Sequence, residues 1–217
     1  MALVLVSAVV DGVVTLTLCR PEKKNALSIA LRDELSDTLD ALSSDGSVKV
    51  VVLTGAGSVF SAGFDLSEFD DPAVWPSSDR FHHTVLRFPL PTIAAVNGAA
   101  LAGGFDLAVL CDLRVAAEGA YFAHVEHTFG DVVYRPLREL VGAGVARDLV
   151  LTGRRIEARE ALVLGLVNRV VPEDRLLDEA ASVAAEIALA PRDVLMRTKA
   201  KIIAVAAIDP DATTLEL

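Results

Sequence analysis

The stretch NGAALAGGFDLAVLCD, residues 97–112, places two adjacent glycines and a carboxylate where a long apolar run begins. Gly103 and Gly104 have no Cβ, so a ligand can approach the backbone closely there. The apolar run predicts a buried helix that starts near Gly103, and the first N–H groups of a helix have no partner within it. Those N–H groups and the positive end of the helix dipole attract an anion or a developing oxyanion. The alternative is structural, with Asp106 capping a core helix and the glycines allowing close packing.

Strands and helices alternate on both sides of this stretch. The alternation of Val13–Arg20 predicts a half-buried strand, and the β-branched runs at 48–57 and 92–98 predict strands buried on both faces. Ser28 is a predicted N-cap, followed by leucines at helical spacing. Helices are also predicted from Arg135 to Gly153, before Gly165, and after Pro172 and Pro191, with short strands at 113–127 and 166–172. The segment 69–83, rich in Pro, Ser and Asp, is predicted to be a mobile loop.

The composition limits the class of protein. The chain has 217 residues, 53% of them hydrophobic, but no uninterrupted apolar run reaches the ~18 residues of a membrane helix. We therefore expect the apolar surplus to be buried in a core and in a subunit interface. A net charge of −10 argues against nucleic acid as a partner. Cys19 and Cys111 make no disulfide framework, which fits a reducing cytoplasm.

Two further stretches carry candidate chemistry. SVFSAGFDLSEF, residues 58–69, follows a buried strand and is otherwise an ordinary strand-to-helix loop. YFAHVEHTFG, residues 121–130, is predicted as a strand with His124 and Glu126 on one face and His127 on the other. Ligands on opposite faces cannot converge, so no metal site is expected. A buried carboxylate is costly unless it is partnered or functional, which makes Glu126 a candidate.

Three motifs in order resemble the enoyl-CoA hydratase/isomerase family, also called the crotonase superfamily. They are RPEKKNALS (20–28), FSAGFDL (60–66) and VNGAALAGGFDLAVLCDLRVA (96–116), and VLTGRRIEAREALVLGLVNRVV (150–171) is similar to a later helix–strand segment. The resemblance runs from about Val13 to about Lys201. It implies an α/β fold, a crotonase-like spiral of ββα turns with C-terminal helices that assemble trimers or hexamers. Residues 1–170 are then the spiral core with the acyl-CoA site, and residues 171–217 a C-terminal helical oligomerisation segment that is shorter than usual.

The resemblance also implies a role for each matching residue. The backbone N–H groups of Phe64 and Gly103 are expected to converge on the thioester oxygen at about hydrogen-bond distance, with Asp106 and Glu126 handling protons. Coenzyme A, as part of the substrate, is expected along Lys24, Ala26, Ala62, Asp65 and Leu66. No separate cofactor and no metal are implied.

The sequence departs from the family pattern at three places. Asp106 is one methylene, or ~1.5 Å, shorter than the usual glutamate, which weakens the hydratase interpretation and leaves isomerisation untouched. The loop FGDVVYRPLREL after Glu126 is shorter and bulkier than usual, so the length of the acyl group stays open. The chain reaches Leu217 earlier than most members, which implies a smaller trimer interface or a truncated tail.

The first functional hypothesis is hydration of 2-enoyl-CoA, because both proton-handling positions carry carboxylates. The alternatives are a double-bond isomerase that uses Glu126 alone and an acyl-CoA binder without turnover. A dinucleotide oxidoreductase built on LTGAGSVF is weakly supported, since Phe60 stands where the third small residue belongs. A serine hydrolase is poorly supported, because Val59 replaces the glycine two residues before Ser61.

Overall fold

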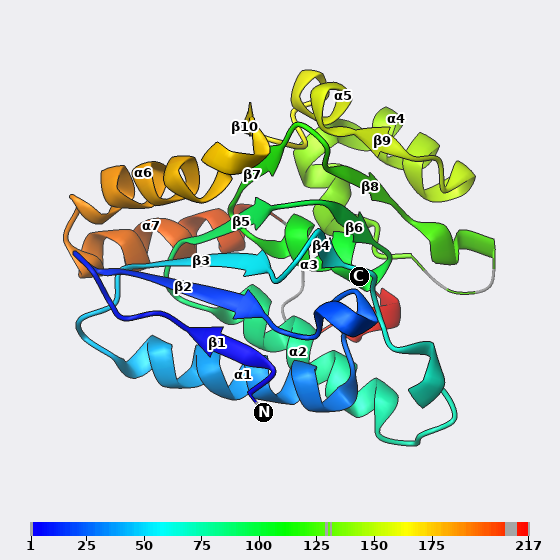
Figure 1. Ribbon diagram of the computed structural model, residues 1–217, viewed down its shortest axis with the longest axis horizontal. Coiled ribbons are helices and arrows are strands. Elements are labelled where there is room, and N and C mark those ends of the chain that lie inside the picture. The colour runs from blue at the N-terminus through cyan, green and yellow to red at the C-terminus, as the bar shows by residue number, and fades with distance from the viewer. Residues whose placement is uncertain (1, 129, 131, 207–211, 217) are drawn as a thin grey trace.

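The computed structural model describes residues 2–128, 130, 132–206 and 212–216 (Figure 1). Within them the main sheet has the order β1-β2-β3-β5-β7-β10 and a second sheet the order β4-β6-β8-β9. Apart from the outer strands β1 and β9, which are antiparallel, the strands run parallel. The strands are Val4–Val6 (β1), Val13–Leu18 (β2), Val50–Gly55 (β3), Val59–Ser61 (β4), Thr92–Val96 (β5), Ala99–Leu101 (β6), Leu113–Ala117 (β7), Tyr121–Ala123 (β8), Ile156–Glu157 (β9) and Arg169–Val171 (β10).

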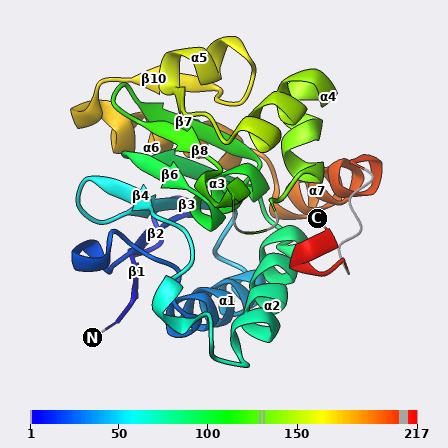
Figure 2. The same ribbon diagram turned by 90° about the vertical axis from the view of Figure 1, so that its right-hand side faces the viewer.

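The helices surround the two sheets (Figure 2). Helices α1 and α2 pack against each other below the main sheet, α6 covers β2, β3, β5 and β7, and α3 lies against β4 and β6. The α-helices are Ile29–Ser44 (α1), Val74–Arg87 (α2), Gly103–Leu110 (α3), Arg135–Thr152 (α4), Ala158–Val163 (α5), Leu176–Ala188 (α6) and Arg192–Val205 (α7). The 3-10 helices are Pro21–Lys23 (η1), Leu66–Glu68 (η2), Val125–Thr128 (η3), Glu173–Arg175 (η4) and Thr214–Glu216 (η5).

Most predicted elements are confirmed. The Ser28 hydroxyl accepts from Leu31 N–H at 3.2 Å and begins α1, as an N-cap does. All six residues of β3 are buried, as expected for a strand covered on both faces. Helix α4 ends at Gly153, which adopts the left-handed conformation of a C-terminal cap. The predicted α/β alternation is therefore present.

The predicted loop at 69–83 is wrong, because most of it belongs to α2. Pro76 lies in the first turn of α2, where a missing N–H leaves no hydrogen bond unmade. Buried residues then recur at helical spacing on the face toward the core: Val74, Ser77, Ser78, Phe81, His82, Val85 and Leu86. Small polar residues on this buried stripe hide the helical period from a hydropathy pattern.

One hydrophobic core connects β2, β3, β5 and β7 with α1, α3 and α6. The predicted division at residue 170 falls within β10, and α6 from the second part packs on the main sheet; the division stays a prediction. None of the helices in the described residues has the length and apolar character needed to cross a membrane.

Candidate active site

The glycine pair lies at the start of α3, whose eight residues are all buried. A Cβ at Gly103 would lie 2.7 Å from two ring carbons of Phe64, and a Cβ at Gly104 would lie 2.5 Å from the Ser61 carbonyl oxygen. The neighbouring loop therefore requires glycine at both positions. The residue before them, Ala102, has φ 49° and ψ −129°, which residues with a Cβ rarely adopt. The backbone is strained at the point where α3 begins.

The loop that carries Phe64 touches the start of α3. Gly63 has φ 89°, and a Cβ there would come within 3.1 Å of the Gly103 nitrogen. Leu27 N–H donates to the Gly63 carbonyl at 2.8 Å and holds the loop in place. Neither Phe64 N–H nor Gly103 N–H donates a hydrogen bond to another residue in the described part of the chain. Two unused donors thus lie on touching segments, and their convergence on one acceptor stays a prediction.

A cavity of about 130 Å³ opens where these segments meet, and all four predicted catalytic residues line it. They are Phe64, Gly103, Asp106 and Glu126. Phe69 and Trp75, whose ring centroids are 6.4 Å apart, give the cavity an aromatic wall. The cavity is therefore apolar on one side and acidic on the other.

The acidic side is a cluster of three buried residues. His124 Nδ1 lies 3.0 Å from Glu126 Oε1 and 3.8 Å from Asp106 Oδ1. Three buried atoms of this cluster have no hydrogen-bond partner among the described residues: Asp106 Oδ1, Glu126 Oε2 and His124 Nε2. Burial, and then the charge of Glu126, raise the pKa of Asp106 well above its usual value. Burial therefore favours the protonated form of Asp106 relative to an exposed aspartate.

The predicted strand through Glu126 is wrong, although the residues it singled out do meet. The strand β8 ends at Ala123, and the chain turns into η3 at Val125. This turn brings the Glu126 carboxylate to the His124 ring, which packs against Phe105 at a centroid distance of 4.5 Å. A period-two pattern could not reveal the turn, because His124, Val125 and Glu126 still alternate polar with apolar after β8 ends.

The residues expected to bind coenzyme A lie around the same two loops. Ala62 and Leu66 line the cavity, and the Ala62 N–H donates to the Lys24 carbonyl at 3.0 Å. Lys24 is exposed. The Ala26 carbonyl accepts from Arg20 at 2.8 Å, and Asp65 forms an ion pair with Arg20 at 3.1 Å. Only Ala62 and Leu66 of these five therefore reach the cavity itself.

Three residues that sequence reasoning missed hold these loops. Arg20 ties Ala26 to Asp65, as described above. Asn25 is fully buried, and its side-chain amide donates to the carbonyls of Ala56 and Val59. The Arg32 guanidinium lies 4.3 Å from the centre of the Phe64 ring, and burial lowers its pKa. Their partners lie up to 45 residues away in sequence, so no local pattern indicated them.

The acidic cluster is also the one group among the described residues whose side chains are spaced for a metal ion. Ligand atoms of Asp106, His124 and Glu126 lie within 4.8 Å of one another, and His127, expected on the opposite face, is not part of the group. The 3.0 Å distance between His124 Nδ1 and Glu126 Oε1 is that of a hydrogen bond, so the contact between these two residues does not require a metal ion. We assign no metal to it.

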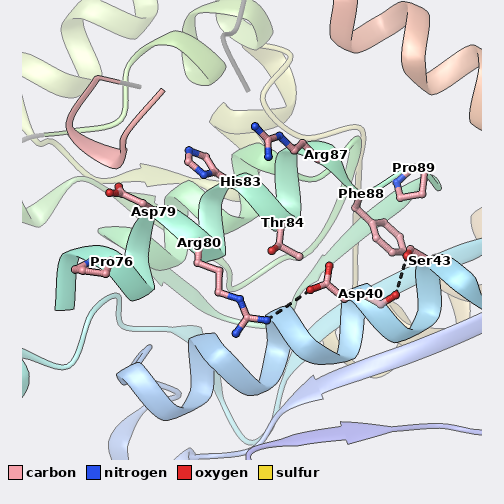
Figure 3. A pocket seen from close by; sticks show the side chains of 10 residues that line it. All are labelled: Asp40, Ser43, Pro76, Asp79, Arg80, His83, Thr84, Arg87, Phe88 and Pro89. Atoms are coloured by element: carbon pink, nitrogen blue, oxygen red, sulfur yellow. Dashed lines mark hydrogen bonds and ion pairs between the residues drawn. The ribbon is translucent and has the colours of Figure 1, made fainter. Parts of the chain in front are cut away.

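A larger groove of about 530 Å³ lies between α1 and α2 (Figure 3). Arg80 reaches across it to Asp40, with 3.5 Å between Nη2 and Oδ2. None of the predicted site residues lines this groove. The unused amides and the buried acids therefore single out the smaller cavity.

Known proteins resemble this chain over nearly all of its length. A family model described as Enoyl-CoA hydratase/isomerase matches residues 9–217. A protein named putative enoyl-CoA hydratase from Thermus thermophilus is 41% identical over 196 residues, which cover 85% of this chain and 78% of that protein. A protein named 4-chlorobenzoyl coenzyme A dehalogenase-2 from Arthrobacter is 37% identical over 83% of this chain and 71% of its own.

Solved structures show the same fold. The crystal structure of an enoyl-CoA hydratase from Bacillus anthracis superposes with a TM-score of 0.89 at 35% identity, covering 96% of this chain and 85% of that one. This match confirms the crotonase-like fold expected from the sequence motifs.

Proposed function

Because this chain belongs to the enoyl-CoA hydratase/isomerase family, we propose that it hydrates 2-enoyl-CoA thioesters. It is a crotonase-type acyl-CoA enzyme. The observation that carries the finer proposal is that two carboxylates, Asp106 and Glu126, line one cavity together with two unused backbone donors. Hydration needs both acids, whereas isomerisation needs one and binding without turnover needs neither.

The backbone donors stabilise the enolate. The thioester oxygen accepts hydrogen bonds from Phe64 N–H and Gly103 N–H, so negative charge that develops on it meets donors already fixed in place. Only the amide of Phe64 is needed for this, and its side chain is free to shape the acyl cavity. Coenzyme A runs along the loops of Lys24, Ala26, Ala62, Asp65 and Leu66, of which Ala62 and Leu66 line the cavity.

The two acids handle the water. They hold one water molecule beside the double bond, its hydroxyl forms a bond to the β-carbon, and a proton is delivered to the α-carbon. The π-bond breaks and its electrons pass through the enolate to the new C–H bond. The product is a 3-hydroxyacyl-CoA. Proton transfer by a positioned side chain contributes ~10²–10⁴-fold to such a rate.

Isomerisation of the double bond by Glu126 alone is the second candidate. It needs a single base, so it does not depend on Asp106. Glu126 would then remove a proton from one carbon and return it to another through the same enolate. A binder without turnover needs only the amides and the cavity.

We also propose that the chain assembles as a trimer or a dimer of trimers and works in the cytoplasm. Large apolar side chains are exposed at Val163, Leu189 and Val205, each more than 80% accessible. Free thiols at Cys19 and Cys111 support a reducing compartment. Light scattering at micromolar concentration tests the assembly, and a monomer there would contradict it.

The decisive experiment compares Asp106→Asn with Glu126→Gln, each of which keeps shape and removes a carboxylate. Wild type and variants are assayed with a crotonyl-type 2-enoyl-CoA for hydration and with a 3-enoyl-CoA for isomerisation. For a hydratase, either change lowers kcat by about 100-fold or more, with thioester binding kept. For an isomerase, only Glu126→Gln does so. A wild type that binds the thioesters and converts neither substrate would be a binder, and the proposal of hydration would be wrong.

A further inference from the structure

His124 stands between the two acids of the candidate active site. Its Nδ1 atom is the one that approaches both, at 3.0 Å from Glu126 Oε1 and 3.8 Å from Asp106 Oδ1. We propose that His124 is a positioning residue whose Nδ1–H holds Glu126 as the ionised base and leaves Asp106 as the acid that carries the transferable proton. This inference rests on the proposed hydratase function and names how its two acids divide the work.

Burial fixes the tautomer that this role needs. His124 is 1% exposed, and its Nε2 atom has no hydrogen-bond partner among the described residues. Hydrogen on Nδ1 makes the hydrogen bond to Glu126 and leaves only an acceptor unused at Nε2, whereas hydrogen on Nε2 would bury a donor without a partner. The Phe105 ring packs on the imidazole and offers it no acceptor. The hydrogen-bond partners therefore favour the tautomer with hydrogen on Nδ1.

The distances then distinguish the two acids. At 3.0 Å the Nδ1–H group donates a hydrogen bond to Glu126, whereas 3.8 Å is too long for a hydrogen bond to Asp106. Asp106 is buried with an unpartnered oxygen, and its raised pKa agrees with a retained proton. The surrounding titratable groups are Asp106 from α3 and Glu126 and His127 from η3. The charged residues Arg135, Arg138 and Glu139 of the adjoining α4 are exposed.

The division of labour gives a balanced step. Glu126 accepts a proton from the water while the water oxygen bonds to the β-carbon. The Asp106 carboxyl gives its proton to the α-carbon, and the enolate electrons form that C–H bond. One proton has left the water and one has left Asp106, so Glu126 ends protonated and Asp106 ends ionised. A proton must then return from Glu126 to Asp106 before the next turnover, and the imidazole lies between them.

The first test reads the tautomer directly and needs no substrate. Long-range ¹H–¹⁵N NMR of histidine-labelled protein distinguishes hydrogen on Nδ1 from hydrogen on Nε2, and His124→Asn assigns the signal. We expect a neutral Nδ1–H ring at pH 7. An Nε2–H ring or an imidazolium would overturn the inference even if the wild type hydrates enoyl-CoA. An Nδ1–H ring in a protein without hydratase activity would support the positioning of Glu126 and refute the proposed function.

The second test separates positioning from packing. His124→Phe keeps a ring against Phe105 and removes the donor, whereas His124→Asn places an amide N–H near the position of Nδ1. We expect His124→Phe to lower kcat by about 10- to 100-fold with little change in KM, as loss of an orienting partner does. We expect His124→Asn to restore most of that kcat. Equal loss in both variants, or a loss confined to KM, would refute the positioning role.

Discussion

His124 and His82 are both buried, and each has an Nε2 atom without a partner among the described residues. Their neighbours differ. His124 faces two carboxylates that keep unused oxygens toward a cavity. His82 lies on α2, where its Nδ1 pairs with the Ser78 carbonyl at 2.8 Å and lies 3.2 Å from the hydroxyl of Thr214. Burial alone therefore does not distinguish the two histidines. What distinguishes them is that the carboxylates beside His124 have oxygens without hydrogen-bond partners and line a cavity.

The two clusters meet the same cavity from different sides. Thr214 lines the cavity while its N–H and hydroxyl groups both donate to Asp79. We call Ser78, Asp79, His82 and Thr214 the α2 cluster. This cluster holds one wall of the cavity in place, whereas the acidic cluster supplies the candidate catalytic groups. Changes at the acidic cluster should alter activity, and changes at the α2 cluster should alter stability.

The largest expected effect follows from filling the space at Gly103. In Gly103→Ala the new Cβ would lie 2.7 Å from two carbons of the Phe64 ring, so the ring must shift, and we expect this to disturb the two backbone donors. Loss of one donor to a developing oxyanion costs ~10²–10³-fold in kcat. Steady-state kinetics with a 2-enoyl-CoA measure it, and urea unfolding provides the control. If Gly103→Ala lowers the free energy of unfolding and leaves kcat unchanged, Gly103 is needed for packing and not for catalysis.

The next effect concerns His82 and acid stability. Burial lowers the pKa of His82 to about 4, against about 6.5 in an unfolded chain. Between these values the unfolded state binds one more proton. The contribution of His82 to the free energy of unfolding is therefore fully present above pH 6.5 and is lost as the pH drops toward 4. The loss amounts to about 3 kcal/mol over that range. Urea unfolding at several pH values measures it, with Arg32, Asp79 and His83 as the nearby charged groups.

A matched variant isolates this contribution. His82→Gln keeps a polar side chain that cannot titrate, so its unfolding free energy should fall less steeply between pH 6.5 and 4. Asp106 contributes the opposite slope: its folded pKa is raised, so its contribution is complete below the unfolded value and is lost as the pH rises. Asp106→Asn should therefore stabilise the fold most at high pH. Parallel slopes for the wild type and His82→Gln would show that His82 titrates normally.

The comparison also shows what the sequence could predict. Gly103, Asp106 and Phe64 belong to short motifs whose spacing is set by one turn between a strand and a helix, so their place was predictable. Glu126 was found for its burial cost, although the strand predicted for it was wrong. The α2 cluster was missed because Pro76 and buried serines conceal a helix. Arg32 and Asn25 act on partners distant in sequence, which only the folded chain brings together.

A smaller effect is expected at Ala102, next to the acidic cluster. Its φ of 49° and ψ of −129° are strained for a residue with a Cβ. Ala102→Gly removes that strain at the expense of a buried methyl contact and extra freedom in the unfolded chain, and we expect a net gain of about 1 kcal/mol. Chemical unfolding measures it. A destabilised variant would show that the contact between Ala102 and Gly63 outweighs the strain.

The smallest change tests the length of the acid at position 106. Asp106 Oδ1 stops 3.8 Å from His124 Nδ1 and has no partner among the described residues. Asp106→Glu adds ~1.5 Å of reach toward the proposed water site beside Glu126. If reach limits hydration, kcat toward a 2-enoyl-CoA should rise several-fold, since ~1 Å of misplacement is costly where geometry governs the rate. His82→Gln, which removes no carboxylate, should leave kcat within a few-fold of the wild type in the same assay. Unchanged or lower activity in Asp106→Glu would mean that the cavity is built around the shorter acid. The 3.8 Å separation between Asp106 Oδ1 and His124 Nδ1 would then be a feature that the active site requires.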